Sequence, residues 1–421
     1  MAATWQKAVL QELCEITSSK RIYAADYQFE GVPFYRGKEI IEKHKGSLVV
    51  STELFISEEK FLDIRRKFGA PKAGELLLTS VGTLGVPYVV RPGERFYFKD
   101  GNLTWFRNFR QLDSHFLYYW LLSPLGKAEL GKCTIGTSQS ALTIVLLKDM
   151  EIQLPSLHAQ RKIVGILSAY DDLIENNTRR IKILEEMAQA IYREWFVHFR
   201  FPGHKKAKLA PSPLGPIPHG WEFKRITDAV SVDPTTSVPR EGEKPFVPMS
   251  SLSNDSMLVR DIESRTGNSG SKFKNGDTLF ARITPCLEND KTAFVQFLPT
   301  GEDVAFGSTE FIVLRSKTLS PEFAYLLARM PEFRNNAIKS MSGATGRQRV
   351  QPACFEKFRF AHPDAHTLRA FGEQVAPIFQ EVQLYALKNE NLRRTRDLLL
   401  PKLISGELDV SDLDINVEDA A

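Results

Sequence analysis

The sequence predicts an α/β (α+β) fold with two similar mixed α/β domains, separated by two long helices that form an antiparallel coiled-coil spacer. Three observations indicate this class. Segments recur at an interval near 210 residues, both recurring regions mix strand-like and helix-like patterns, and each is followed by a long stretch with coiled-coil spacing. An interval of this length is typical of duplicated domains and far too long for a solenoid repeat.

The repeat is visible in short matching segments. Trp5 returns as Trp221, 216 residues later, and Val32-Pro33 returns as Val247-Pro248. The run 116–122 (FLYYWLL) returns as 323–327 (FAYLL), and 136–140 (GTSQS) has a looser echo in 344–349 (ATGRQR). Two similar domains in one chain suit an extended, two-part target. Duplication without a shared target is the alternative.

The first domain is predicted at 1–154. Short apolar runs at 76–78 and 86–90 alternate with Gly and Pro, which favours strands and turns, and a helix is expected from Asp113 to Leu122. A helical stretch then covers 155–200. Its apolar residues alternate in steps of four and three, the spacing of a coiled-coil seam, and about 40 helical residues would make a rod of roughly 60 Å.

The segment 201–220 is rich in Pro and Lys and is interpreted as a semi-extended linker. The second domain is predicted at 221–362, with strands around 277–280 and 310–314. A second helical seam covers 363–406, where Pro377 is expected to kink or interrupt the helix near Val375. The acidic tail, 407–421, lacks periodicity and is expected to be disordered.

One asparagine interrupts each seam: Asn177 in the first and Asn389 in the second. By their step order they occupy the two different core positions of the heptad, which opposed helices place across from each other. We therefore expect an antiparallel pairing with the two asparagines in or near one layer, where they set the helix register at some cost in stability. Two independently solvated asparagines are the alternative.

Composition limits the class of protein. The 421 residues are 43% apolar and 25% charged, as in ordinary globular proteins, and a net charge of +4 permits a polyanionic partner without requiring one. The four cysteines lie far apart, so disulfides and metal clusters are not expected, and His362 and His366 have only Cys354 nearby as a third ligand. No signal peptide or membrane-length apolar run is present, so a cytoplasmic protein is expected.

Catalytic motifs are absent from the sequence. It contains no phosphate-binding G-x-x-x-x-G-K-[ST], no dinucleotide-binding G-x-G-x-x-G, and no Asn/Asp-Pro-Pro-aromatic tetrapeptide for holding a target amine. The segment 288–291 (ENDK) resembles a nuclease cluster, but one contiguous turn without a partner carboxylate is more typical of a solvated loop. We therefore expect no catalysis and no bound cofactor or metal.

Two glycine-bounded loops carry residues suited to reading DNA. Arg can donate two hydrogen bonds to guanine, and Gln can pair with adenine in the major groove. Phosphate contacts or plain surface turns are the alternatives for every candidate. The candidates are Thr345, Arg347, Gln348 and Arg349 in the second domain, and Ser138, Gln139 and Ser140 in the first.

Further candidates flank predicted strands. Arg36 and Lys38 follow a Pro-containing strand, and a small polar loop after 76–78 suits a close approach to DNA. The candidates in that loop are Thr79, Ser80, Gly82 and Thr83, with Arg282 and Thr284 at the matching place in the second domain.

Several segments resemble those of one known family, the type I restriction-modification specificity subunits (HsdS). The resemblance lies at the domain junctions, in 154–163 (LPSLHAQRKI), 184–196 (LEEMAQAIYREWF), 214–221 (LGPIPHGW) and 396–408 (RDLLLPKLISGEL). Within the domains it lies in 32–40 (VPFYRGKEI), 78–85 (LTSVGTLG) and 280–289 (FARITPCLEN).

The resemblance implies a non-catalytic subunit in which each domain is a target-recognition domain for half of a split, asymmetric site in double-stranded DNA. It also implies that the helices set the spacing and dock two methyltransferase (M) subunits, which restriction (R) subunits join. The assembled complex would methylate adenine N6 with S-adenosylmethionine and cleave DNA with ATP and Mg²⁺. A stand-alone DNA-binding regulatory protein is the main alternative, and a catalytic nuclease is a more distant one.

Overall fold

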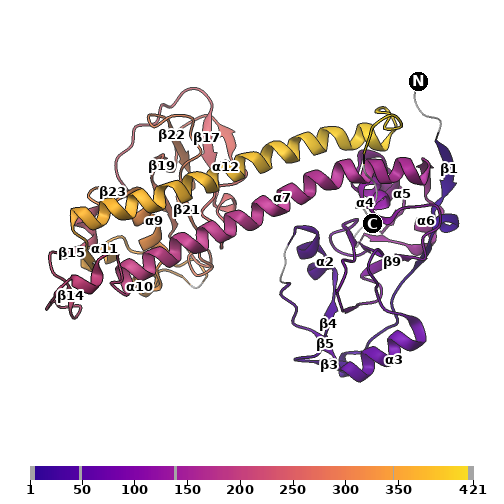
Figure 1. Ribbon diagram of the computed structural model, residues 1–421, viewed down its shortest axis with the longest axis horizontal. Coiled ribbons are helices and arrows are strands. Elements are labelled where there is room, and N and C mark those ends of the chain that lie inside the picture. Colours follow the sequence, from indigo (N-terminus) through magenta and orange to yellow (C-terminus); the bar gives the residue numbers. More distant parts are fainter. Residues whose placement is uncertain (1–4, 47–49, 137–139, 345, 416–421) are drawn as a thin grey trace. The chain divides into compact units, whose positions relative to one another are not determined.

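The computed structural model describes residues 5–46, 50–136, 140–344 and 346–415. The chain forms two compact units (Figure 1). Unit 1 comprises 1–175 and 391–421, and unit 2 comprises 176–390. Both boundaries fall within long helices, α7 (Leu157–Tyr192) and α12 (Ala365–Ile404), so each helix contributes one part to each unit.

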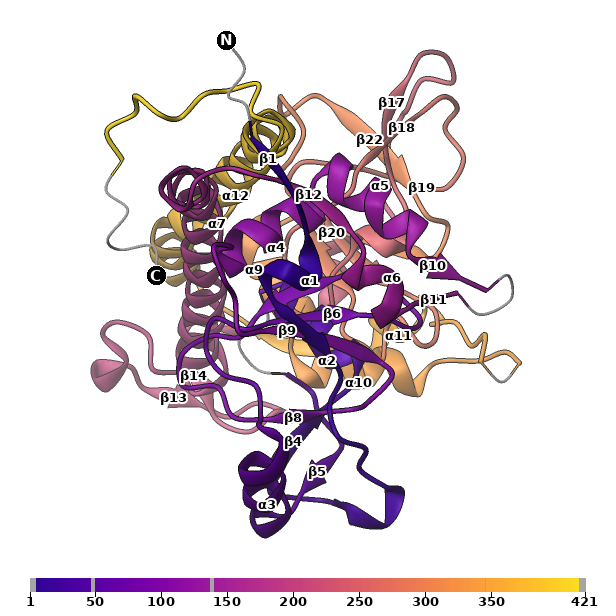
Figure 2. The same cartoon turned by 90° about the vertical axis from the view of Figure 1, so that its right-hand side faces the viewer.

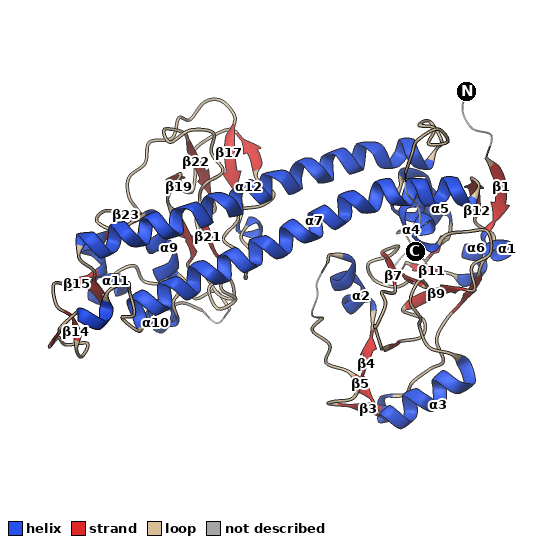
Figure 3. Cartoon of the chain, viewed as in Figure 1, coloured by secondary structure: helices blue, strands red, loops and turns tan. Residues whose placement is uncertain are grey.

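Unit 1 is built on two four-stranded sheets (Figure 3). The first has the order β2 (Glu15–Thr17), β9 (Leu103–Arg107), β6 (Leu76–Thr79), β7 (Pro87–Val89), all antiparallel. The second has the order β3 (Tyr27–Gln28), β5 (Phe55–Ile56), β4 (Val32–Tyr35), β8 (Tyr97–Phe98), with β4 and β8 parallel. Two pairs complete the strands: β1 (Gln6–Val9) with β12 (Glu151–Leu154), and β10 (Thr134–Ile135) with β11 (Ala141–Leu142).

Side-chain caps define where several helices of unit 1 begin. The Asp113 carboxylate accepts hydrogen bonds from the backbone N–H groups of His115 and Phe116, so the predicted helix starts after it. Ser57 and Ser123 cap their helices in the same way. The helices are α1 (Leu10–Leu13), α2 (Gly37–His44), α3 (Glu58–Phe68), α4 (Ser114–Leu122), α5 (Pro124–Lys132) and α6 (Ile144–Lys148).

The first sheet of unit 2 repeats the order of the first sheet of unit 1. One sheet runs β16 (Val230–Val232), β23 (Phe311–Ser316), β20 (Thr278–Ala281), β21 (Thr292–Phe294). The other runs β18 (Glu263–Arg265), β17 (Lys244–Val247), β22 (Val304–Gly307), β19 (Ser271–Lys274), with β17 and β22 parallel. β15 (Glu222–Arg225) pairs with β24 (Arg359–His362), and the short helices are α8 (Ile226–Ala229), α9 (Pro321–Ala328), α10 (Pro331–Lys339) and α11 (Cys354–Lys357). The first sheets match in order, which supports the internal duplication. The second sheets share only the triplets β5-β4-β8 and β18-β17-β22. The fourth strand differs, because β3 adds to β5 in unit 1 whereas β19 adds to β22 in unit 2.

Strand register identifies which residues are equivalent. Gln6 of β1 pairs with Leu154, and Glu222 of β15 pairs with His362. Trp5 and Trp221 therefore each stand one residue before equivalent strands, β1 in unit 1 and β15 in unit 2. The match of Val32-Pro33 with Val247-Pro248 is wrong by three positions. The parallel pairs begin at Phe34 in β4 and at Phe246 in β17, so the equivalent of Pro33 is Pro245. A two-residue match lacks the information to set a strand register.

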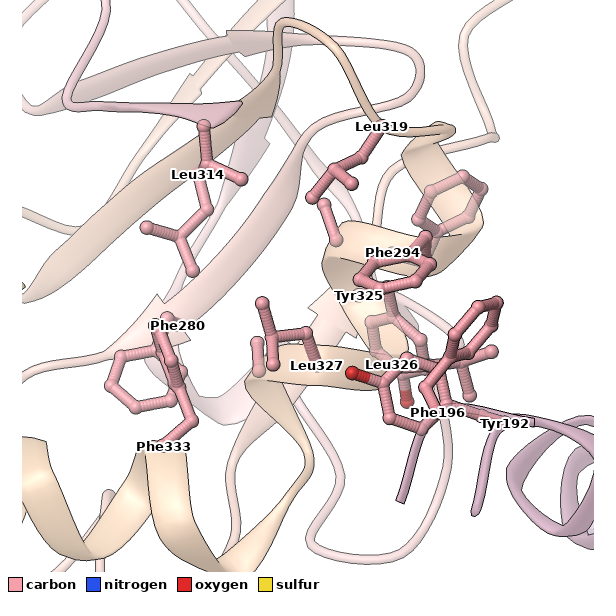
Figure 4. Packing of buried hydrophobic residues seen from close by; sticks show 14 of the residues in the cluster. Tyr192, Phe196, Phe280, Phe294, Leu314, Leu319, Tyr325, Leu326, Leu327 and Phe333 are labelled. Atoms are coloured by element: carbon pink, nitrogen blue, oxygen red, sulfur yellow. The ribbon is translucent and has the colours of Figure 1, made fainter. Parts of the chain in front are cut away.

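The core of unit 2 joins its sheet to both long helices (Figure 4). Phe323 of α9 lies with its ring centroid 5.0 Å from Tyr192 and 4.6 Å from Phe196. Phe371 of α12 lies 4.8 Å from Phe196. Full burial of such side chains contributes about 1.5–3 kcal/mol each, so this cluster fixes both helices to the rest of unit 2.

The two long helices are antiparallel, as the heptad spacing predicted. Within unit 2, Arg180 of α7 donates to the Tyr385 hydroxyl of α12 at 3.0 Å, and the ring of Tyr192 contacts that of Phe371. Residue numbers therefore rise along α7 as they fall along α12. Asn177 and Asn389 are both buried, and Asn177 Nδ2 donates to Asn389 Oδ1 at 2.9 Å. The expected contact is therefore present. Its role in setting register remains a prediction.

Pro377 does not end the second helix. The sequence predicted a kink or an interruption near Val375, and the interruption is absent because α12 is continuous from Ala365 to Ile404. The kink stays a prediction. Proline removes one backbone hydrogen bond, but Val375, Phe379 and Val382 around it are fully buried in the core of unit 2. Tertiary packing outweighs the local penalty.

Two segments outside the predicted domains and helices make defined contacts. Within the linker 201–220, which the sequence predicted to be semi-extended, β13 (Leu209–Ala210) pairs with β14 (Ile217–Pro218). The acidic tail was expected to be disordered. Residues 407–415 of the acidic tail pack on unit 1, where Val410 is buried and Lys162 Nζ donates to the Ser411 carbonyl at 2.7 Å. Across the described residues, no helix is both long and apolar enough to cross a membrane.

Candidate nucleic-acid interface

Three segments of unit 2 meet at one junction. The end of β20, the residue before β23 and the hairpin 342–349 are joined by backbone hydrogen bonds. Arg282 N donates to the Glu310 carbonyl at 3.0 Å, and the Arg282 carbonyl accepts from Val350 N at 2.8 Å. Ser342 and Arg349 exchange two further bonds at 3.1 and 2.9 Å, which close the hairpin. The junction therefore places residues 282–284, 310 and 347–349 together. The hairpin extends from the edge of its unit (Figure 2).

Arg349 is paired in this structure. Its Nε lies 3.0 and 2.9 Å from the two carboxylate oxygens of Glu310, and its Nη2 lies 2.6 Å from Oε1. The Arg349 guanidinium lowers the pKa of the Glu310 carboxyl below its usual value. Glu310 was not among the sequence candidates, because the sequence pattern places it at the start of a predicted strand. Only its contact with Arg349 across the junction identifies it as part of the candidate site.

The neighbouring candidate residues are of two kinds: some hold the hairpin in place, and others expose their side chains. Thr284 Oγ1 accepts from Gln348 N at 3.0 Å, and Thr284 N donates to the Gln348 carbonyl at 3.1 Å, so Thr284 fastens the hairpin. Arg347 is exposed and Gln348 is half-buried. Arg282 is half-buried, and no hydrogen-bond partner for its Nε occurs among the described residues. Arg347 and Arg349 are thus the exposed members of the predicted set among the described residues of this unit, and Thr345 lies outside the described residues.

Unit 1 has the same junction with other side chains. Ser80 N donates to the Asn102 carbonyl at 2.8 Å, and the Ser80 carbonyl accepts from Leu142 N at 3.0 Å. These bonds make Ser80, Asn102 and Ala141 the counterparts of Arg282, Glu310 and Arg349, since Val81 bridges Ala141 as Ile283 bridges Arg349. Ser140 is exposed at the end of this hairpin. The candidates Ser138 and Gln139 lie outside the described residues.

The loop after β6 is less open than the sequence predicted. Thr79 is fully buried and its hydroxyl accepts from Val86 N at 2.9 Å, while Ser80 is buried and lies 2.7 Å from the Thr104 hydroxyl. These two side chains are buried within the loop, so their hydroxyls are not on its surface. The close approach of DNA to the loop stays a prediction. Gly82 and Thr83 are exposed, and Gly82 has a φ of 80° that favours glycine.

Arg36 and Lys38 begin helix α2 beside this loop. A Cβ atom on Gly37, between them, would lie 3.9 Å from both Thr79 and the Val81 carbonyl, so the helix start and the loop are neighbours. The Arg36 guanidinium donates to Glu39 at 3.0 Å and is partly buried. Lys38 is half exposed, 4.0 Å from Glu42. Lys38 is therefore the more accessible cation.

Two further features bear on binding. The described residues contain no group of three or more His, Cys, Asp or Glu side chains placed to hold a metal ion, and His362 bonds instead to the Thr318 hydroxyl at 2.9 Å. The long helices expose large apolar side chains. In unit 2 these are Ile183, Met187, Leu384 and Leu387, each 44% exposed or more.

The chain is similar to proteins of one kind. Residues 3–186 match the model of the type I restriction modification DNA specificity domain. The MjaIX specificity subunit of Methanocaldococcus jannaschii is 27% identical over 359 residues, which cover 81% of this chain and 79% of that protein. The HindI specificity subunit of Haemophilus influenzae is 21% identical, over 63% of this chain and 71% of that protein. The fold resembles the crystal structure of the type I S subunit from M. genitalium, with a TM-score of 0.57 at 15% identity over 95% of this chain and 96% of that one.

Proposed function

Because the chain belongs to the family of type I restriction-modification specificity subunits, we propose that it supplies DNA sequence recognition to such a complex and performs no catalysis itself. Unit 1 reads one half of a bipartite site in double-stranded DNA, and unit 2 reads the other. The site is asymmetric because the two units present different side chains.

The paired junction carries this proposal. Each unit holds a hairpin against the end of one strand, which is β6 in unit 1 and β20 in unit 2. Equivalent backbone hydrogen bonds form the junction, at Ser80 in unit 1 and at Arg282 in unit 2. The frame is therefore shared while the side chains on it differ, which is what two readers of unlike sequences require. Arg, Gln, Thr and Ser at such positions match the donor and acceptor pattern of base edges, and the accessible lysines suit phosphates.

The long helices supply spacing and docking in this proposal. Helices of 36 and 40 residues can hold two readers at separate half-sites, about 34 Å or a multiple of it apart. The exposed apolar side chains on α7 and α12 favour packing against helices of two methyltransferase subunits. Restriction subunits would complete the complex. S-adenosylmethionine, and ATP with Mg²⁺ for restriction, would be bound by those partners.

A domain exchange tests the division of labour. The full chain is expressed with its methyltransferase subunits, and the methylated motif is determined by sequencing modified bases in genomic DNA. Residues 1–154 are then replaced by the corresponding domain of another family member, with the junction at the end of β12. One half of the motif should change while the other half and the spacer remain. A change in both halves would contradict independent reading.

The reciprocal exchange is the matched control. Replacement of residues 221–362 should alter the half that the first exchange left unchanged. Complex formation is followed by size analysis with and without methyltransferase subunits. A chain that binds one DNA sequence tightly, alone and without these subunits, would favour a stand-alone regulatory protein instead.

A further inference from the structure

We propose that Glu310 is a positioning residue for base readout: it holds one edge of the Arg349 guanidinium and directs the other edge toward a guanine in the half-site read by unit 2. This inference rests on the proposed function, because it assumes that the hairpin 342–349 enters a DNA groove. It adds a residue that sequence reasoning did not select, and it specifies a base.

The ion-pair geometry leaves one hydrogen-bonding edge of Arg349 available. Glu310 contacts Nε and Nη2 at 2.6 to 3.0 Å, so the carboxylate occupies the Nε–Nη2 edge. The second edge is formed by Nη1 and the remaining proton of Nη2. Among the described residues no hydrogen bond to Nη1 is found. An edge with two parallel N–H donors matches O6 and N7 of guanine.

The backbone holds both partners in place. Glu310 is tied to Arg282 by a bond of 3.0 Å, and Arg349 is tied to Ser342 by two bonds and bridged to Ile283. The Glu310 side chain is 22% exposed and that of Arg349 is 44% exposed. The carboxylate therefore lies on the inner side of the pair and the guanidinium on the outer side, which directs the open edge away from the unit.

The charges favour this arrangement over a free arginine. The Arg349 guanidinium lowers the pKa of Glu310, so the carboxylate stays ionised at neutral pH and keeps its hold. A side chain already held in one geometry loses less conformational freedom on binding. The carboxylate also cancels one positive charge at the hairpin, which weakens attraction to phosphates of any sequence. Both effects raise the ratio of specific to non-specific binding.

Unit 1 lacks this pair. The counterparts of Glu310 and Arg349 are Asn102 and Ala141, and neither can form a charged fork. The inferred guanine contact therefore belongs to one half-site only. An ordinary surface ion pair with no part in readout is the competing interpretation of the same geometry, since such pairs commonly contribute little.

The experiment compares variants of the full chain in complex with its methyltransferase subunits. Once the methylated motif is known, binding is measured to the cognate duplex and to duplexes in which each G·C pair of the unit 2 half-site is replaced. Glu310→Gln should reduce discrimination at one G·C pair by about tenfold, within the range of a bidentate base contact. Binding to unrelated DNA should strengthen, with a steeper salt dependence, because the variant loses one negative charge and leaves the positive charge of Arg349 uncompensated.

Two further variants separate orientation from charge. Arg349→Lys keeps the charge but lacks the fork, so it should lose discrimination at the same base pair while the salt dependence stays unchanged. Glu263→Gln is the matched control: it also removes a carboxylate paired with an arginine, Arg265, on the surface of unit 2. It should leave discrimination as in the unaltered chain. Thermal unfolding of each variant confirms that the fold is kept.

The outcomes are distinct. If Glu310→Gln discriminates as the unaltered chain does, or loses affinity uniformly at every base pair, the inference about Glu310 is overturned while the proposed function stands. If the unaltered complex shows no sequence preference at all, the proposed function itself fails.

Discussion

Units 1 and 2 share the strand order of their first sheet, yet their contacts with the long helices have opposite chemistry. Helices α7 and α12 each begin two residues after a proline, Pro155 or Pro363, which makes Asp171 and Phe379 equivalent positions. In unit 1 the Asp171 carboxylate accepts from the Tyr119 hydroxyl at 2.7 Å and from Arg396. In unit 2 Phe379 is fully buried, with its ring centroid 4.9 Å from that of Phe294.

This difference shows that the backbone frame tolerates either chemistry. A polar cluster needs every partner present, whereas an aromatic cluster needs volume and complementary shape. The same freedom applies at the hairpin junction, where Ala141 in one unit corresponds to Arg349 in the other. Strand pairing maintains the architecture, and side chains at equivalent positions are free to diverge.

The largest expected effect comes from removing the aromatic contact. Phe379→Ala should destabilise unit 2 by about 3–5 kcal/mol, because it removes a fully buried ring and leaves a cavity. The free energy of unfolding is measured by urea denaturation of the full chain. Leu387→Ala on the same helix, at an exposed position, should change it by less than about 0.5 kcal/mol. Equal losses in both variants would contradict the assignment of Phe379 to the core.

The asparagine layer should follow in size. Asn177→Leu removes the donor to Asn389 Oδ1 and should cost about 1–3 kcal/mol. At the duplicated positions of the two helices stand Tyr385 and Ile181, so the helix pair already accepts a layer without this amide pair. The double variant Asn177→Leu/Asn389→Leu should recover most of the loss. If it instead remains as unstable as the single variant, the cost does not arise from a broken amide pair.

The polar contact of unit 1 should be weaker than its aromatic counterpart. Asp171→Ala removes the acceptor of Tyr119 and Arg396, but both Asp171 and Arg396 are partly exposed, so we expect about 1–2 kcal/mol. The loss should shrink as salt is raised, because screening weakens the ion pair in the unaltered chain. The loss from Phe379→Ala should not respond to salt in this way. The comparison fails if both losses have the same salt dependence.

The smallest effect concerns pH. Glu185 of α7 is buried, which raises the pKa of its carboxyl, although it accepts from Met257 N at 2.6 Å and the Ser256 hydroxyl at 2.8 Å. The folded protein therefore holds the Glu185 proton more tightly than the unfolded chain does. The free energy of unfolding falls as pH rises from below the pKa of Glu185 in the unfolded chain to above its pKa in the folded protein. Glu185→Gln lacks this loss, so its stability relative to the unaltered chain should increase as pH rises above the ordinary pKa of a glutamate, about 4.3. The free energy of unfolding of both proteins is measured across this pH range.

The neighbouring Glu186→Gln is the control for that measurement. Glu186 is exposed and paired only loosely with Lys182, at 3.9 Å, so its removal should produce no such trend with pH. The corresponding position in unit 1 is Arg393, which carries no carboxyl. Opposite or equal trends for the two glutamine variants would show that burial of Glu185 does not govern the pH response.

Much of the fold could be predicted from local spacing. The steps of three and four apolar residues indicated both long helices, and the position of each asparagine in those steps placed Asn177 opposite Asn389, as found. The helix expected from Asp113 to Leu122 is present as Ser114–Leu122, and the structure shows that Asp113 caps it. The recurrence near 210 residues identified two domains of one topology.

The candidate interface depended far more on tertiary structure. Sequence reasoning identified polar residues beside glycines, but Thr79 and Ser80 turned inward while Thr83 remained on the surface. The partner of Arg349 lies 39 residues away at Glu310, and no local pattern connects the two.

By itself, the sequence determined the helical periodicity and the duplication, because the first depends on residues a few positions apart and the second on direct comparison of segments. Only the tertiary structure decided that Pro377 sits in a continuous helix, that 407–415 pack on unit 1, and that a carboxylate holds Arg349. Those outcomes depend on packing and pairing between distant segments, whose energies exceed the local preferences that a sequence pattern reports.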